Sequence, residues 1–269
     1  MTINEKEMLN QQAREFWNSF VVEVTNHNRF QPKHPLPLFI KDYLNTHTTY
    51  MESGTILYRA RIIDWDKPDA KKTGIIRKYV NHEDYGDFEG FDEQRSFVPP
   101  ADFVPSGRAN PEKIVYLYAA TETITAIGET RPRIQDDISV AKIEILRKIK
   151  LADLTQKIAS NTESLDELKI AQITHAFSHP CKDPVEYIPT QYIAEYIKNL
   201  GYDGILFRSS FVPDGTNVTI FHPDVAKAIA SAPYKIDSIA YYARRTGSCT
   251  PWSAFEIMAT NDKRYQNKS

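Results

Sequence analysis

The sequence predicts an α+β protein in which a mixed β core with flanking helices follows an N-terminal helical segment. Three observations support this fold class. Residues 5–26 place apolar side chains at helical spacing, whereas residues 55–63 show the alternation and β-branching that are typical of a strand. Further along, short strand and helix patterns follow one another without the regular alternation of a parallel α/β sheet.

Residues 1–50 are expected to form a helical appendage. The apolar positions of residues 5–26 share one helical face: Met8, Leu9, Phe16, Phe20, Val21 and Val24. This helix is expected to end near residues 26–28, before a proline-rich connection. Residues 36–44 predict a second, short amphipathic helix, and residues 45–50 are polar.

The first strand is predicted at residues 55–63, with Arg59 and Arg61 on one side. Residues 64–112 hold few apolar positions and many Asp, Gly and Pro residues, which predicts a long loop region. Loops of this length in compact domains are usually functional or mobile. The region ends at residues 105–111, which form a turn by composition.

The remaining elements complete the mixed pattern. Strands are predicted at residues 114–119, 138–146, 149–151, 205–207, 217–221 and 236–242. Helices are predicted at residues 121–129, 164–178 and 191–200. Thr121 is the candidate N-cap of the first of these helices.

Composition and charge exclude several classes of protein. The 269 residues suffice for one large domain or for one domain with an appendage, and two cysteines are too few for a disulfide scaffold. The 33 Lys and Arg residues nearly balance the 35 Asp and Glu residues, so no overall field attracts nucleic acid or an anionic membrane. No apolar run approaches a membrane span, and no secretion signal is evident. We therefore expect a soluble cytoplasmic protein.

Glycine is scarce, with 10 Gly against 15 Tyr and 13 Phe. The glycine-rich signatures of P-loop proteins and Rossmann domains are absent, as is the serine motif of α/β-hydrolases. A dinucleotide would therefore be bound by arginines and aromatic rings rather than by a cradle of backbone amides.

Metal and polyanion sites have little support. His175 and His179 lie one helical turn apart with Cys181 nearby, but no glutamate follows His175 and a proline would break the helix. The acidic residues 82–90 do not follow the EF-hand pattern and are interpreted as a solvated loop. The basic pairs are also interpreted as solvated surface: 71–72, 77–78 and 244–245. We expect no metal.

Polar residues gather at the ends of predicted elements, where binding sites are commonly built. They are Arg59, Arg108, Asn110, Tyr118, Glu129 and Ser209. Taken singly, each has a structural explanation, and Glu129, for example, would fit a surface cluster with the arginines that follow it. Taken together, they point to a functional site.

These residues carry a resemblance to the RES-domain family, named for Arg, Glu and Ser, whose members are NAD-consuming toxins of bacterial toxin-antitoxin pairs. The resemblance covers about residues 54–222 through motifs at 57–61, 107–110, 116–119, 126–129, 192–197, 201–209 and 215–221. Arg108, Tyr118 and Glu129 follow one another at intervals of 10 and 11 residues, as in the family. The chain departs from the family at Ala109, where a tryptophan is usual. The segments 64–106 and 147–188 are also longer than in compact members.

The resemblance implies an ADP-ribosyltransferase-like fold in a catalytic domain at residues 51–243, followed by a tail at 244–269. It implies that NAD is the substrate and that the bond between nicotinamide and ribose is broken by hydrolysis or phosphorolysis. Inorganic phosphate is then a candidate co-substrate, and a protein antitoxin is an expected partner. Two alternatives stay open: a protein ADP-ribosyltransferase that uses NAD, and a RES-like binding module without turnover.

The charged residues suit this chemistry. A carboxylate beside the ribose stabilises the positive charge of an oxocarbenium-like transition state, and Glu129 is the candidate. Guanidinium groups bind phosphate oxygens through paired hydrogen bonds, with Arg108 as the first candidate and Arg59 as the second.

Aromatic and hydroxyl side chains complete the expected site. Tyr118, with Tyr58 behind it, is expected to stack on the nicotinamide or ribose. Ser209 is expected to orient Glu129 or a ribose hydroxyl, and Ser210 competes with it for this role. The resemblance adds two further NAD-binding residues: Asn110 and Asn217.

Overall fold

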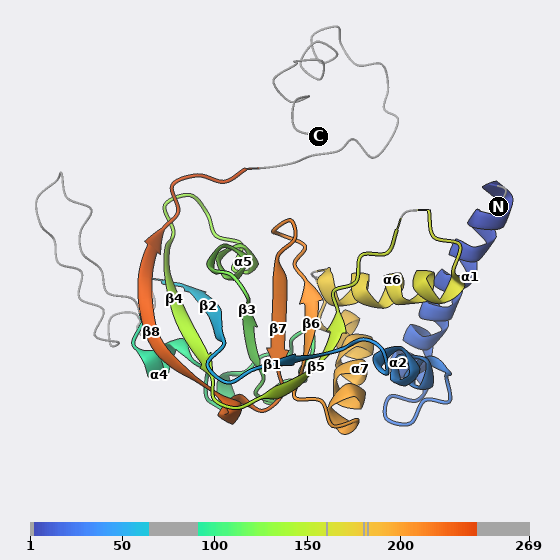
Figure 1. The fold of residues 1–269 in the computed structure, drawn as a ribbon, viewed down its shortest axis with the longest axis horizontal. Coiled ribbons are helices and arrows are strands. Elements are labelled where there is room, and N and C mark those ends of the chain that lie inside the picture. The colour runs from blue at the N-terminus through green and yellow to red at the C-terminus, as the bar shows by residue number, and fades with distance from the viewer. Residues whose placement is uncertain (1–2, 65–90, 160, 180, 182, 241–269) are drawn as a thin grey trace, which may run out of the picture. The chain divides into compact units, whose positions relative to one another are not determined.

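The computed structural model describes residues 3–64, 91–159, 161–179, 181 and 183–240. It confirms the α+β class, with an 8-stranded sheet and flanking helices (Figure 1). The strands are β1 Thr48–Met51, β2 Ile56–Ile62, β3 Leu117–Ala120, β4 Asp137–Ile145, β5 Ile149–Leu154, β6 Gly204–Arg208, β7 Thr216–Ile220 and β8 Ala226–Lys235. The helices are α1 Ile3–Val22, α2 Leu36–Leu44, α4 Glu93–Ser96, α5 Thr123–Glu129, α6 Leu165–Ser178 and α7 Ile188–Asn199. Short helical turns lie at η1 Glu23–His27, η2 Ala101–Phe103, η3 Pro184–Tyr187 and η4 Pro223–Val225.

The described strands are ordered β1-β5-β6-β7-β3-β2-β4-β8 in the sheet. Neighbours β5 and β6 are parallel, and the other neighbouring pairs are antiparallel. In the β3–β7 pair, Tyr118 lies opposite Thr219 and Ala120 lies opposite Asn217. Because side chains alternate along a strand, Tyr118 and Asn217 share one face of the sheet.

Helices α1, α2, α6 and α7 gather beside the β5–β6 part of the sheet (Figure 1). Their buried side chains form one hydrophobic cluster that includes Phe20 of α1, Ile40 of α2, Phe177 of α6, Ile193 of α7 and Ile205 of β6. The residues predicted as an N-terminal appendage thus contribute to the core of the sheet. The domain boundary at residue 50 stays a prediction.

Local signals explain where α6 and α7 begin. The Ser164 hydroxyl accepts a hydrogen bond from the Glu167 amide at 3.3 Å, which caps α6. The Asp183 carboxylate caps the turn η3 in the same way, and a proline occupies the first turn of α7, where its missing N–H costs nothing. Helix α7 then begins beside the turn at residues 105–111.

Two predictions about element ends are wrong. Residues 236–240 form no strand, whereas β8 occupies Ala226–Lys235, where the sequence has little alternation. This strand forms because its backbone extends the sheet beside β4. Thr121 is not the N-cap of α5, because this helix begins at Thr123. The Thr121 hydroxyl contacts the carbonyl of Thr216 instead.

Several predicted segments lie outside the described residues: 65–90, with its acidic and basic stretches, and 241–269, with the rest of the predicted final strand and the tail. The described part of the long loop region contains α4 and η2. No helix within the described ranges is long and apolar enough to cross a membrane.

Candidate active site

A pocket of about 290 Å³ lies where β2, β3, β7, α5 and the turn at residues 105–111 meet. Its lining includes these residues from the sequence prediction: Tyr58, Arg59, Arg108, Tyr118, Glu129 and Asn217. The other two, Asn110 and Ser209, stand just behind the lining and form hydrogen bonds with Tyr118 and Glu129. The structure therefore brings together side chains that are far apart in the sequence.

Glu129 ends helix α5, and its carboxylate is held by two neutral donors. The Ser209 hydroxyl and the Asn217 amide donate to the same oxygen, Oε1, at 2.7 and 2.6 Å. Among the described residues, no Lys or Arg forms an ion pair with Glu129. The carboxylate is thus fixed in direction by neutral donors, and its negative charge faces the pocket without a cationic partner.

The structure also distinguishes the two candidate serines. The Ser209 oxygen accepts hydrogen bonds from the amides of Phe211 and Val212 at 3.1 and 3.2 Å, so its proton is directed to Glu129. The Ser210 hydroxyl donates instead to the carbonyl of Ser178, away from the carboxylate. Ser209 is therefore the serine that contacts Glu129.

The turn that carries Arg108 is attached to Tyr118. The Tyr118 hydroxyl donates to Asn110 Oδ1 at 2.7 Å and accepts from the amide of Ala109 at 2.9 Å. A Cβ atom on Gly107 would lie 2.4 Å from Asn110 Oδ1 and 3.1 Å from the Tyr118 hydroxyl, so a side chain at this position would displace Asn110. Asn110 and the Tyr118 hydroxyl therefore shape the pocket wall. Tyr118 also lines the pocket, so the expected stacking of its ring and the expected NAD contact of Asn110 stay predictions.

Burial raises the pKa of Tyr118 to about 12, and the Ala109 amide and the Arg108 charge offset part of this effect. A raised pKa means that the neutral phenol stabilises the folded state below its ordinary pKa of about 10, and that this contribution is lost as the pH rises towards 12.

Tyr118→Phe is expected to lower the free energy of unfolding by about 1–3 kcal/mol below pH 10, because two buried polar groups lose their partner. The difference from wild type should shrink between pH 10 and pH 12, because in this range the phenol ionises in the unfolded wild-type chain before it does so in the folded protein. Denaturant unfolding of both proteins across this pH range measures it. A difference that stays constant would show that the hydroxyl is not the buried donor described here.

Two arginines bring positive charge to the pocket. Burial, with a smaller contribution from the nearby Arg61, lowers the pKa of Arg59 to about 10, so its guanidinium stays charged at neutral pH. Arg59 donates to the carbonyl of Ser96 at 3.0 Å, and Arg108 lies over the Phe207 ring with 5.3 Å from its guanidinium carbon to the ring centroid. Arg108 Nε is buried without a hydrogen-bond partner in the described structure. Neither Arg59 nor Arg108 forms an ion pair with another described residue, and two guanidinium groups without an ion pair suit an anionic ligand.

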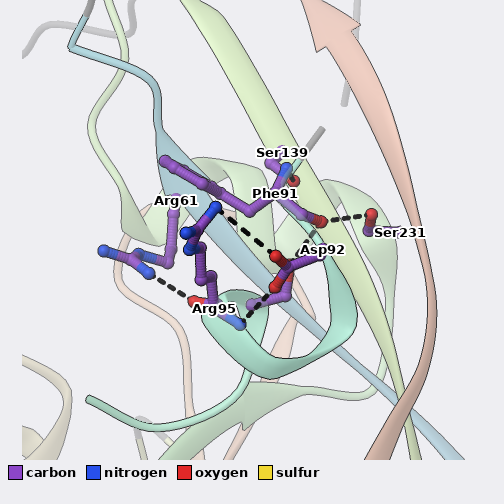
Figure 2. A network of polar contacts seen from close by, with 7 residues as sticks. Arg61, Phe91, Asp92, Arg95, Ser139 and Ser231 are labelled. Carbon is purple, nitrogen blue, oxygen red and sulfur yellow. Dashed lines mark hydrogen bonds and ion pairs between the residues drawn. The ribbon is translucent and has the colours of Figure 1, made fainter. Parts of the chain in front are cut away.

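The network in Figure 2 holds α4 and the residues just before it against the sheet. Phe91 donates its amide to the Ser139 hydroxyl at 2.9 Å and accepts at its carbonyl from Ser231 at 2.5 Å. Arg61 donates to the carbonyl of Arg95 and lies over the Phe91 ring. Arg61 is therefore occupied by α4, whereas Arg59, two residues earlier, lines the pocket.

Some contributors to the pocket were not predicted, among them two aromatic residues and a glutamine. Tyr187 and Phe207 line it, and Gln191 of α7 holds the turn behind Arg108. The run at 205–207 predicted a buried strand, and the helical pattern placed Gln191 in a helix. No local signal shows that Phe207 or Gln191 lies beside the turn of Arg108, because these contacts join segments about 80 to 100 residues apart.

His175 and His179 stack with 3.9 Å between ring centroids. Burial, and then the charge of His179, lowers the pKa of His175. Within the described residues no group of three His, Cys, Asp or Glu side chains could hold a metal ion.

A family model described as the RES domain matches residues 82–241, more than half of the chain. Among solved structures, the chain is similar to one chain of the M. tuberculosis MbcT-MbcA toxin-antitoxin complex. The identity is 12%, the TM-score is 0.40, and the alignment covers 73% of this chain and 92% of that chain. Comparison with curated proteins found no match. The family match includes the pocket residues from Arg108 to Asn217, whereas Tyr58 and Arg59 precede it.

Proposed function

The chain belongs to the RES domain family, and we propose that it degrades NAD by breaking the bond between nicotinamide and ribose. The observation that carries the proposal is the Glu129 carboxylate, held by Ser209 and Asn217 at the wall of a pocket that also contains two arginines. We propose residues 51–243 as the catalytic domain, acting in the cytoplasm.

The proposed reaction needs negative charge at one point of the pocket. As the bond from ribose C1′ to the nicotinamide nitrogen breaks, its electron pair leaves with nicotinamide and positive charge grows on the ribose ring. A carboxylate already fixed beside the ring stabilises this charge without reorganisation. Water then attacks C1′ and loses a proton to give ADP-ribose, or phosphate attacks to give ADP-ribose-1-phosphate. Glu129 is the proposed carboxylate.

The rest of the pocket would hold the substrate. Arg108 and Arg59 offer guanidinium groups to the pyrophosphate, and Arg108 has an Nε–H free of any partner in the described structure. Tyr118 and Tyr58 both line this pocket and offer aromatic faces for the nicotinamide or ribose, and the bond from the Tyr118 hydroxyl to the turn fixes the position of its ring. These contacts would replace a glycine-rich loop.

Purified protein incubated with NAD should release free nicotinamide, measured by chromatography. Product analysis with and without added phosphate separates ADP-ribose from ADP-ribose-1-phosphate. NAD with a tagged adenine, added to a cell lysate, would label a protein if the enzyme transfers ADP-ribose instead. Absence of nicotinamide release without phosphate, with phosphate and in the lysate would contradict the proposal.

Ser209→Ala is expected to lower kcat for nicotinamide release about 10- to 100-fold, because one hydrogen bond to the Glu129 carboxylate is lost. Ser210→Ala is the matched control, since its hydroxyl contacts Ser178 instead, and should stay close to wild type. Steady-state measurements of kcat for both variants show which of the two serines supports the reaction. Equal activities, or a larger loss in Ser210→Ala, would overturn the assignment of Ser209.

A further inference from the structure

We propose that Gln191 is a positioning residue that fixes the turn carrying Arg108 and thereby sets the affinity for NAD, an inference that rests on the proposed function. Gln191 is 3% exposed and lies in the first turns of α7. Its side chain does not line the pocket itself. It acts on the substrate only through the turn at residues 106–110.

Gln191 contacts three residues of this turn. Its amide nitrogen lies 2.8 Å from the carbonyl of Gly107, 3.0 Å from the carbonyl of Asn110 and 2.8 Å from the Ser106 hydroxyl. The preceding residue, Thr190, donates its hydroxyl to the carbonyl of Arg108 at 2.6 Å. Two adjacent side chains of one helix thus bind four residues of the turn: Ser106, Gly107, Arg108 and Asn110.

The orientation of the Gln191 amide is also specified. Arg29 donates to Gln191 Oε1 at 3.3 Å, which directs the amide nitrogen, with its two protons, towards the turn. Arg29 belongs to the connection between η1 and α2. The N-terminal 50 residues therefore contribute to the support of the pocket wall.

This support matters for the substrate because Arg108 has few restraints of its own. Its Nε–H has no partner in the described structure, and its guanidinium rests on the Phe207 ring. The direction of the side chain is therefore set by the backbone of the turn. A displaced Arg108 would lose the geometry for paired, charge-assisted hydrogen bonds to the pyrophosphate, and the affinity for NAD would fall.

Gln191→Leu is expected to raise KM for NAD about 10- to 100-fold, with a smaller change in kcat. In an Arg108→Ala background the same substitution should change KM less than about twofold, because the group that it positions is already gone. Asn199→Leu, on the same helix but without a contact to the turn, is the matched control. An equal effect of Gln191→Leu in both backgrounds, or none in the wild type, would overturn the proposal.

A second substitution and a second measurement cover two further outcomes. If the melting curve shows that Gln191→Leu is unfolded, Thr190→Val replaces it in the test. Thr190→Val should also raise KM for NAD in the wild type and change it much less in the Arg108→Ala background. If the wild type neither binds nor cleaves NAD, the proposed function fails. The positioning role is then tested by the NMR signals of the Gly107 and Ala109 amides. These signals should move in Gln191→Leu and not in Asn199→Leu, and unmoved signals would refute the positioning role.

Discussion

Glu129→Gln is expected to lower kcat for nicotinamide release about 100- to 1000-fold, the loss typical when a preorganised electrostatic group is removed. The substitution keeps the length of the side chain and one acceptor oxygen. The hydrogen bonds from Ser209 and Asn217 can therefore persist while the negative charge is lost. KM for NAD should change little, because the charge acts on the ribose only as the bond breaks.

The matched control is Glu122→Gln, which removes a carboxylate from the residue just before the same helix, α5. Its activity should equal that of wild type, and both variants should melt within a few degrees of it. Steady-state kinetics and melting curves measured side by side separate charge from folding. Full turnover by Glu129→Gln would remove this residue from the reaction.

Arg108→Lys is expected to raise KM for NAD and to weaken binding of ADP-ribose, each about 10- to 100-fold. A lysine keeps the positive charge but loses the planar fork that binds two phosphate oxygens and the flat contact with the Phe207 ring. Calorimetry with ADP-ribose measures this loss without any turnover. Arg133→Lys, a change at an exposed arginine, is the control and should bind as wild type does.

Substitution of Arg108 also tests whether the proposed reaction has a toxic effect in cells. If the protein is a toxin, its expression should arrest growth, and Arg108→Ala should relieve the arrest while the protein accumulates to the same level. Co-expression of an antitoxin partner should relieve it too. Arrest that persists in Arg108→Ala would favour a binding module that acts without turnover.

The sequence predicted those parts of the fold that have a strong local signal. The helix at 165–178 and the strand at 137–145 have clear apolar patterns, and both were found within two residues of their expected ends. Strand β1 lies in a polar segment, and β8 has little alternation, so neither shows a local pattern. Both exist because their backbones pair with β5 and β4, a contact that no local window contains.

The candidate site divides in the same way. The resemblance to the RES family, with its intervals between Arg108, Tyr118 and Glu129, selected these residues, and the structure brings their side chains to one pocket. Residue type alone could not show that the Tyr118 hydroxyl bonds to the turn, since that depends on how Asn110 folds back. Gln191 was missed because a glutamine in an amphipathic helix has no distinguishing mark.

The two donors on Glu129 are also the last parts of the pocket to leave the ribosome. Ser209 and Asn217 follow Glu129 by 80 and 88 residues. At about 5–20 residues per second, translation takes at least several seconds to cover this distance. A nascent chain that already contains both arginines and Glu129 still lacks the two hydrogen bonds that orient the Glu129 carboxylate. The pocket is therefore completed only after most of the chain has been synthesised, and a fragment that ends before residue 209 would retain the charges without the arrangement.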